Sequence, residues 1–147
     1  MLMGKSRYKS SGSSILETTA GLLLLVPIGL FLTDTIALVL AQSSVDSLAK
    51  QAARAAAETP DPNPGDGSAQ AAATVAAKTV ASSYPNSPLA SQPTITSCTY
   101  TDSGSTSQVT VVAQVTFNLP FPVLLIPSST TLHSSATEPI VAVLPNN

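Results

Sequence analysis

Apolar residues are concentrated near the start of the chain, where residues 18–41 form a run interrupted by few polar side chains. At about 1.5 Å per residue, a helix over this run is roughly 36 Å long, which exceeds the roughly 30 Å hydrocarbon core of a bilayer. The run therefore predicts a membrane-spanning helix. Pro27 lies in its middle, where a proline removes a backbone hydrogen bond and kinks the helix or leaves a carbonyl free.

The helical pattern continues beyond the apolar run, because neither glycine nor proline occurs from residue 42 to residue 59. Apolar residues recur there at helical spacing, and the charged residues take another face. The apolar face comprises Val45, Leu48, Ala49, Ala52, Ala53 and Ala56. The sequence thus predicts one helix from about residue 14 to residue 58, half of it in the membrane. On the charged face, Asp46 with Lys50 and Arg54 with Glu58 stand four residues apart, a spacing that favours ion pairs.

A second helix is predicted over residues 68–84, after a break at residues 59–67 that contains three prolines. Ser68 is suited to cap its N-terminus. A weak apolar stripe on this helix comprises Ala72, Val75, Ala76 and Val80.

The pattern then changes from helical to alternating. Residues 94–101 and 108–117 predict a hairpin, in which Thr96, Cys98 and Tyr100 share one face of the first strand. Residues 129–143 predict a third strand, broken near Pro139. Between them, residues 119–127 are apolar but contain three prolines, so they cannot lie in the middle of a sheet. Either a packed connector or an exposed apolar lip for a partner fits this segment.

The predicted fold class is α+β: a long N-terminal transmembrane helix that extends into a small extracytoplasmic domain, with a second helix and a three-stranded antiparallel sheet. Three regions follow, namely a basic leader at residues 1–12, the helix at residues 13–58, and the small domain at residues 59–147. With 147 residues in all, the part outside the membrane can build only a small core. Charged residues make up 10% of the chain and the net charge is −2, so no basic field favours nucleic acid.

The basic residues of the leader set the expected orientation. Lys5, Arg7 and Lys9 precede the span, and the next basic residue is Lys50. The positive-inside rule then places the N-terminus in the cytoplasm and the small domain outside it. A cleaved secretory signal peptide is the alternative, with Ala41 in the peptidase site, although the apolar core of a signal peptide is usually shorter.

Single residues with reactive side chains give little support for an enzyme. Cys98 is the one cysteine, so an internal disulfide and a multi-cysteine metal site are excluded. It suits a small buried hydrophobe, and the alternative is an intermolecular disulfide outside the cytoplasm. His133 is the one histidine. No nucleophile–base pair, phosphate loop or metal spacing is present, so no catalytic residue, cofactor, metal or small-molecule substrate is expected.

The junction between the leader and the span is the most informative feature. If the chain is cut after Gly12, Ser13 becomes the first residue and Glu17 the fifth. A carboxylate at the edge of an apolar helix is costly to bury, unless the new amino group of the same or a neighbouring subunit pairs with it. In a helix bundle such a pair would set the register. Gly12 and Glu17 before an apolar run resemble the cleavage signal of type IV prepilins.

More of the chain resembles the TadE-like pseudopilins of tight-adherence (Tad) pili. In that family a Glu opens the span, a Pro lies in its middle, an Asp lies near its end, and an Ala-Ala-Arg segment follows. Here Glu17, Pro27, Asp34 and residues 52–54 correspond to them. The later segments VTVVAQVTF, LPFPVLLIP and LHSSATEP are similar to the family in order and spacing. The chain departs from the family pattern after Glu17 and after Asp34, where Thr18, Thr35 and Ile36 replace the usual aromatic and glycine residues.

The resemblance implies a minor pilin or pseudopilin of the bacterial inner membrane. Prepilin peptidase would cut between Gly12 and Ser13, and the mature protein would join a Tad-type pilus or a related secretion apparatus. Its partners would be other pilins, pilus assembly proteins, the peptidase and the lipid bilayer. Glu17, Asp34 and Pro27 are the residues expected to act in assembly and register.

Each of these residues also has a simpler interpretation. Glu17 can mark the cytosolic membrane boundary, Asp34 can reach outward to the interface, and Pro27 can be a tolerated kink. The competing function is an uncleaved, membrane-tethered surface or adhesion protein. It would bind partners through the sheet and the apolar lip at residues 121–126.

Overall fold

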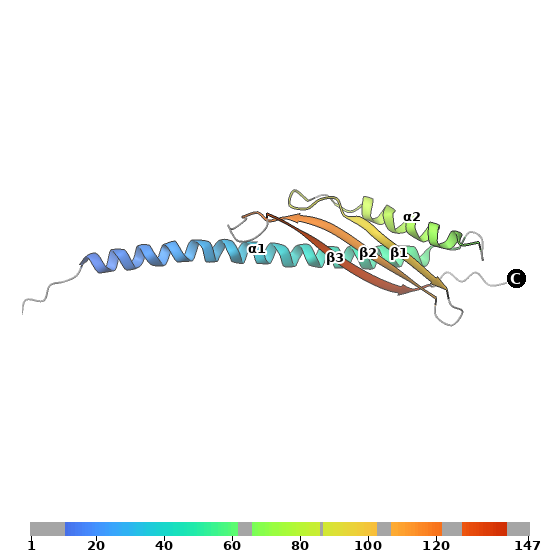
Figure 1. The fold of residues 1–147 in the computed structure, drawn as a ribbon, viewed down its shortest axis with the longest axis horizontal. Coiled ribbons are helices and arrows are strands. Elements are labelled where there is room, and N and C mark those ends of the chain that lie inside the picture. Colours follow the sequence, from blue (N-terminus) through green and yellow to red (C-terminus); the bar gives the residue numbers. More distant parts are fainter. Residues whose placement is uncertain (1–10, 62–65, 86, 103–106, 122–127, 141–147) are drawn as a thin grey trace, which may run out of the picture.

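The computed structural model describes residues 11–61, 66–85, 87–102, 107–121 and 128–140 (Figure 1). Helix α1 comprises Ser11–Glu58 and helix α2 comprises Ser68–Ser82. Strands β1 (Thr94–Asp102), β2 (Ser107–Asn118) and β3 (Ser129–Pro139) form one antiparallel sheet with β2 in the middle. This confirms the predicted α+β arrangement of one long helix, a second helix and a three-stranded antiparallel sheet. β3 ends at Pro139, where the strand predicted over residues 129–143 was expected to be broken, and residues 141–143 lie outside the described residues.

Helix α1 is continuous over its 48 residues, through Pro27, and is therefore about 72 Å long. Its N-terminal half projects alone from the rest of the molecule, whereas its C-terminal half lies along the sheet (Figure 1). Four threonine hydroxyls of the projecting half donate to the carbonyl four residues earlier, over 2.8–3.0 Å. These bonds satisfy polar side chains that an apolar surrounding would leave without partners. The threonines are Thr18, Thr19, Thr33 and Thr35.

The domain has two layers, because both helices lie on the same face of the sheet. α1 contacts β2 and β3, and α2 contacts α1 and β1. Alternate residues of β2 are buried against the helices, namely Val109, Val111, Ala113, Val115 and Phe117. The predicted apolar face on the outer half of α1 is confirmed, since all six of its residues are buried.

Alanines from both helices form the centre of their contact. Ala52, Ala53, Ala56 and Ala57 of α1 are buried with Ala73 and Ala77 of α2 in one cluster. Every fourth residue of α2 is buried, from Ala69 to Ala81. The predicted stripe was wrong at Val75, which is 65% exposed. Its other members are half-buried, and Val80 packs against the core. Helix axes can approach more closely when small side chains lie at the contact, and alanine rather than valine meets this requirement.

The start of α2 also differs from the expectation. Gly67, not Ser68, is the N-cap, and its φ of 81° lies in the left-handed region that glycine adopts without strain. The backbone N–H of Ser68 donates to Asp66 Oδ1 over 2.8 Å, and its hydroxyl donates to Asp61 Oδ1 over 3.0 Å. Ser68 is thus held by two acids and does not cap the helix.

Strand β1 contains a β-bulge between Ile95 and Ser97. The extra residue shifts the alternation, so Ile95 joins Cys98 and Tyr100 on the face that packs against the helices. The simple alternation predicted for this strand was wrong at its first residues. Gln70 of α2 closes part of the strand's outer edge, because its side-chain amide donates to the Cys98 carbonyl and accepts the Tyr100 N–H over 2.6 Å.

Candidate functional site

Asp34 connects the projecting half of α1 to the sheet. Its side chain is 3% exposed, and it is the one polar or charged residue that is buried in the described part of the chain. The backbone N–H of Phe121, which follows β2, donates to Asp34 Oδ1 over 3.1 Å. Oδ2 is also buried and accepts no hydrogen bond from the described residues. The segment after β2 is therefore bonded to α1 inside the apolar run.

Asp34 lies within a mostly apolar and exposed part of α1, between Thr33 and Thr35. Residues 14–29 and 31–33 are exposed, and Leu30, one turn before Asp34, is half-buried. Beyond Asp34 the helix has two sides. Ile36, Val39 and Leu40 remain exposed, whereas Asp34 lies on the side that faces the domain. The apolar surface of α1 thus passes beside the first contact with the domain.

The segment after β2 is described as far as Phe121 and resumes at Ser128. Leu119 and Pro120 are half-buried, and Phe121 is 47% exposed. The Leu119 N–H donates to the Ser128 carbonyl over 3.0 Å, so the two ends of the connection are bonded to each other. Of the predicted connector or lip, residues 122–127 lie outside the described residues.

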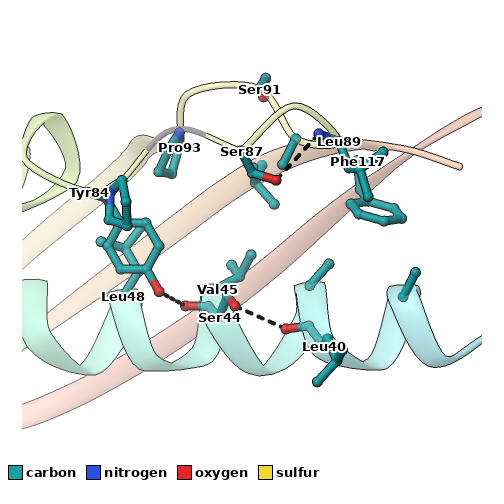
Figure 2. A pocket seen from close by; sticks show the side chains of 15 residues that line it. Leu40, Ser44, Val45, Leu48, Tyr84, Ser87, Leu89, Ser91, Pro93 and Phe117 are labelled. Atoms are coloured by element: carbon teal, nitrogen blue, oxygen red, sulfur yellow. Dashed lines mark hydrogen bonds between the residues drawn. The ribbon is translucent and has the colours of Figure 1, made fainter. Parts of the chain in front are cut away.

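An apolar cavity of about 410 Å³ opens between α1 and the segment that joins α2 to β1 (Figure 2). One wall comes from α1, the other from the segment before β1, and two residues of β2 lie between them. The lining residues are Ala37, Leu40, Ala41, Ser44, Val45 and Leu48, then Tyr84, Pro85, Ser87, Leu89, Ala90, Ser91 and Pro93, with Val115 and Phe117. No charged side chain of the described residues lines it. The cavity is suited to an apolar group and offers no acid, base or nucleophile–base pair for chemistry.

Hydrogen bonds hold both walls of this cavity in place. The Tyr84 hydroxyl donates to the Ser44 carbonyl on α1 over 3.1 Å, as Figure 2 shows. At the other end of the segment, the Asn118 N–H donates to the Leu89 carbonyl over 2.7 Å, and the Ser91 N–H donates to the Thr116 carbonyl over 2.8 Å. The segment therefore pairs with the end of β2 after Gln114, which β1 does not reach.

Asp46 forms a polar contact between α1 and β3. The side chains of Ser134 and Gln42 hydrogen-bond to its carboxylate, the latter over 3.0 Å, and Lys50 lies one turn further along the helix. Together these groups lower the pKa of Asp46, mainly through the Ser134 and Gln42 hydrogen bonds, because all of them favour the charged form. The Gln42 amide also donates to the His133 carbonyl over 3.3 Å.

Arg54 has a different partner from the one that its spacing predicted. Its Nε lies 3.4 Å from Glu138 Oε1 on β3. The expected pair with Glu58 was an inference from helix spacing alone, and the sheet offers Arg54 an acid that the spacing could not indicate. Both side chains keep access to solvent.

The predicted processing and assembly residues lie along the projecting half of α1. Gly12 and Ser13 belong to its first turn, and the side chain of Glu17 is exposed one turn later. Pro27 lies inside the helix. Among the described contacts, Glu17 and Pro27 meet no other part of the chain, whereas Asp34 meets Phe121. An intramolecular partner for Asp34 was not among the sequence-based expectations.

Cys98 is 8% exposed and unpaired, and it lies under α2. Burial raises the pKa of its thiol, and a hydrogen bond with the Thr74 side chain opposes this shift. The expectation of a small buried residue in a strand is confirmed. The alternative, an intermolecular disulfide, stays a prediction, and it would require α2 to move away. The side chain of His133 is exposed on β3. No group of three or more His, Cys, Asp or Glu side chains in the described ranges could hold a metal ion.

Sequence reasoning identified Asp34 but missed its partner, because 87 residues separate it from Phe121. It also missed the Tyr84–Ser44 contact and the polar cluster of Gln42, Asp46 and Ser134. Comparison with protein-family models, with curated proteins and with solved structures finds no match. The functional argument therefore depends on the residues and their geometry.

Proposed function

We propose that this protein is a minor pilin or pseudopilin that helps to assemble a Tad-type (type IVb-like) pilus or a related secretion apparatus. The observation that carries the proposal is α1, one continuous helix whose N-terminal half is apolar and exposed and whose C-terminal half packs under a small sheet. The candidate membrane span within it has a mean hydropathy of 2.3. An exposed apolar half needs either lipid or neighbouring helices to cover it.

In this proposal α1 anchors the chain in the bacterial inner membrane, with the N-terminus in the cytoplasm and the domain outside. Prepilin peptidase cuts between Gly12 and Ser13. Glu17, exposed at the start of the span, then pairs with an amino group in the assembled helices and sets their register. Asp34 Oδ2, buried and without a described partner, is a second acceptor that a neighbouring subunit could use.

The first experiment determines the N-terminal sequence and the intact mass of the protein purified from its own membrane. A start at Ser13 supports the proposal. A start beyond residue 41 would mean a signal peptide and a free domain, and an intact Met1 would favour the uncleaved, membrane-tethered binding protein. Gly12→Leu should block the cut. Gly21→Leu is the matched control, because a side chain at Gly21 meets nothing within 4 Å.

A second experiment tests assembly. Glu17→Ala should leave the protein processed and inserted but reduce the amount that co-purifies with the other pilus components. Glu58→Ala removes an exposed acid from the other end of the same helix and should have no such effect. Equal incorporation of the Glu17→Ala protein would refute a register role for this carboxylate.

A further inference from the structure

The segment that follows β2 reaches α1 inside the apolar run, near its outer end. Phe121 is placed there by its N–H, which donates to Asp34 Oδ1 over 3.1 Å. Asp34 is part of the apolar run of α1, seven residues before its end at Ala41. Whatever surrounds α1 at Asp34 therefore also surrounds Phe121.

The depth of this level in a bilayer follows from helix geometry. A hydrocarbon core of about 30 Å accommodates about 20 helical residues. Counted from Thr18, just after Glu17, the core ends near residue 38, and the apolar run itself ends at Ala41. Asp34 then lies about 6 to 10 Å inside the outer boundary. Interfacial apolar groups enter the boundary between headgroups and acyl chains by roughly 5–10 Å, so Phe121 lies at such a depth.

The residues at this level suit that depth. Phe121 exposes about half of its surface, at 47%, and phenylalanine is among the apolar residues that insert at the boundary between headgroups and acyl chains. No charged residue occurs between Thr116 and Leu132. On α1, the apolar side chains of Phe31 and Leu32 are exposed just below Asp34, so the apolar surface continues from the helix to the segment.

Two backbone N–H groups of the segment have hydrogen-bond partners, as a place with little water requires. An N–H without a partner is costly in such a place. The Phe121 N–H donates to Asp34 and the Leu119 N–H donates to Ser128, so both have partners. This explains why a carboxylate is buried inside the apolar run of α1.

We infer that Phe121, at the described end of the segment after β2, enters the outer interface of the bilayer beside α1, and gives the domain a second contact with lipid. The ligand is the region of phospholipid between the headgroups and the upper acyl chains. Asp34 is the positioning residue that holds the segment at this depth. The inference rests on the proposed insertion of α1 in a membrane.

The test uses single-tryptophan variants, which the natural absence of tryptophan makes possible. The full chain carrying Phe121→Trp is reconstituted into phosphatidylcholine vesicles, with and without bromine on the acyl chains, and tryptophan emission is compared. Leu23→Trp reports on α1 inside the span, and Val75→Trp reports on the exposed face of α2. Slow labelling of Cys98 shows that each variant is folded.

For Phe121→Trp, we expect quenching by bromines placed near the headgroup to exceed quenching by bromines near the chain end, with emission shifted to the blue. Leu23→Trp should be quenched from the chain end, and Val75→Trp should be quenched by neither. If Leu23→Trp is quenched while Phe121→Trp behaves like Val75→Trp, the inference is overturned and the span stands. If Leu23→Trp is not quenched, the proposed insertion of α1 fails, and the inference fails with it.

Discussion

The alanine contact between α1 and α2 leads to the sharpest prediction about stability, concerning Ala77→Leu. Ala77 is fully buried against α1, so the larger side chain has to separate the helices or adopt a strained rotamer. Such overpacking typically costs about 1–3 kcal/mol. Since about 1.4 kcal/mol changes an equilibrium constant tenfold, opening of α2 should become roughly 5- to 140-fold more frequent.

Val75→Ala is the informative comparison, because hydrophobicity alone would place Val75 in the core. Val75 is 65% exposed, so only about a third of its surface is buried. The substitution removes two methyl groups, and only the buried third of their surface contributes to the loss of stability. At about 0.8 kcal/mol per buried methylene, this loss is roughly 0.5 kcal/mol. The gain in helix propensity from valine to alanine is of similar size, about 0.5 kcal/mol. The net change in stability should be close to zero.

Cys98 provides the assay, because the single thiol is buried under α2. A maleimide reacts with it only when α2 opens, so the labelling rate of the folded protein reports the opening equilibrium. Ala77→Leu should raise this rate, and Val75→Ala should not. Ala71→Leu, the same substitution on the exposed face of α2, is the control. A labelling rate for Ala77→Leu within about twofold of the wild type, or an equal rise for Val75→Ala, would refute the reasoning.

Two further predictions concern charged groups. The lowered pKa of Asp46 means that its contribution to stability is present above the usual aspartate pKa of about 3.9 and is lost as the pH falls towards the lower folded value. In thermal unfolding followed by circular dichroism, the wild type should therefore unfold at a higher temperature than Asp46→Asn at pH 7. In acid the two unfolding temperatures should become equal, and a difference that persists in acid would contradict this prediction. Arg54→Ala removes a contact whose side chains are 69% and 29% exposed, so it should change stability by less than about 1 kcal/mol. Labelling of Cys98 checks this prediction, because a loss of stability raises the labelling rate. A rise that corresponds to more than about 1 kcal/mol would contradict it and would show that Arg54 contributes more than its ion pair.

Much of the fold could be predicted from sequence, because periodicity depends only on neighbouring residues. The bounds of α1, the hairpin and the third strand follow from such local patterns. The face of α2 did not, because hydrophobicity ranks valine above alanine, whereas the close approach of two helices selects the smaller side chain. The bulge in β1 shifted one strand by one residue, and nothing in its sequence indicated where.

The candidate site was predictable only in part. Glu17, Pro27 and Asp34 stand out because polar residues and proline are costly in an apolar run. The partner of Asp34 could not be predicted, because the bond uses the backbone of Phe121, and a backbone N–H has no signature in sequence. The contacts of Tyr84 and Arg54 with distant elements could not be predicted either, because each partner is far away in the sequence.

The continuity of α1 has a consequence for the direction in which Glu17 points. Successive residues of a helix are rotated by about 100°, so the 17 steps from Glu17 to Asp34 leave the two side chains about 100° apart around the axis. With no interruption in the helix, this angle is fixed by the number of residues between them. One inserted residue would turn Glu17 by a further 100° or so relative to the sheet, and seven would return it to within about 20°. Any neighbour that binds Glu17 therefore meets the domain from one defined side.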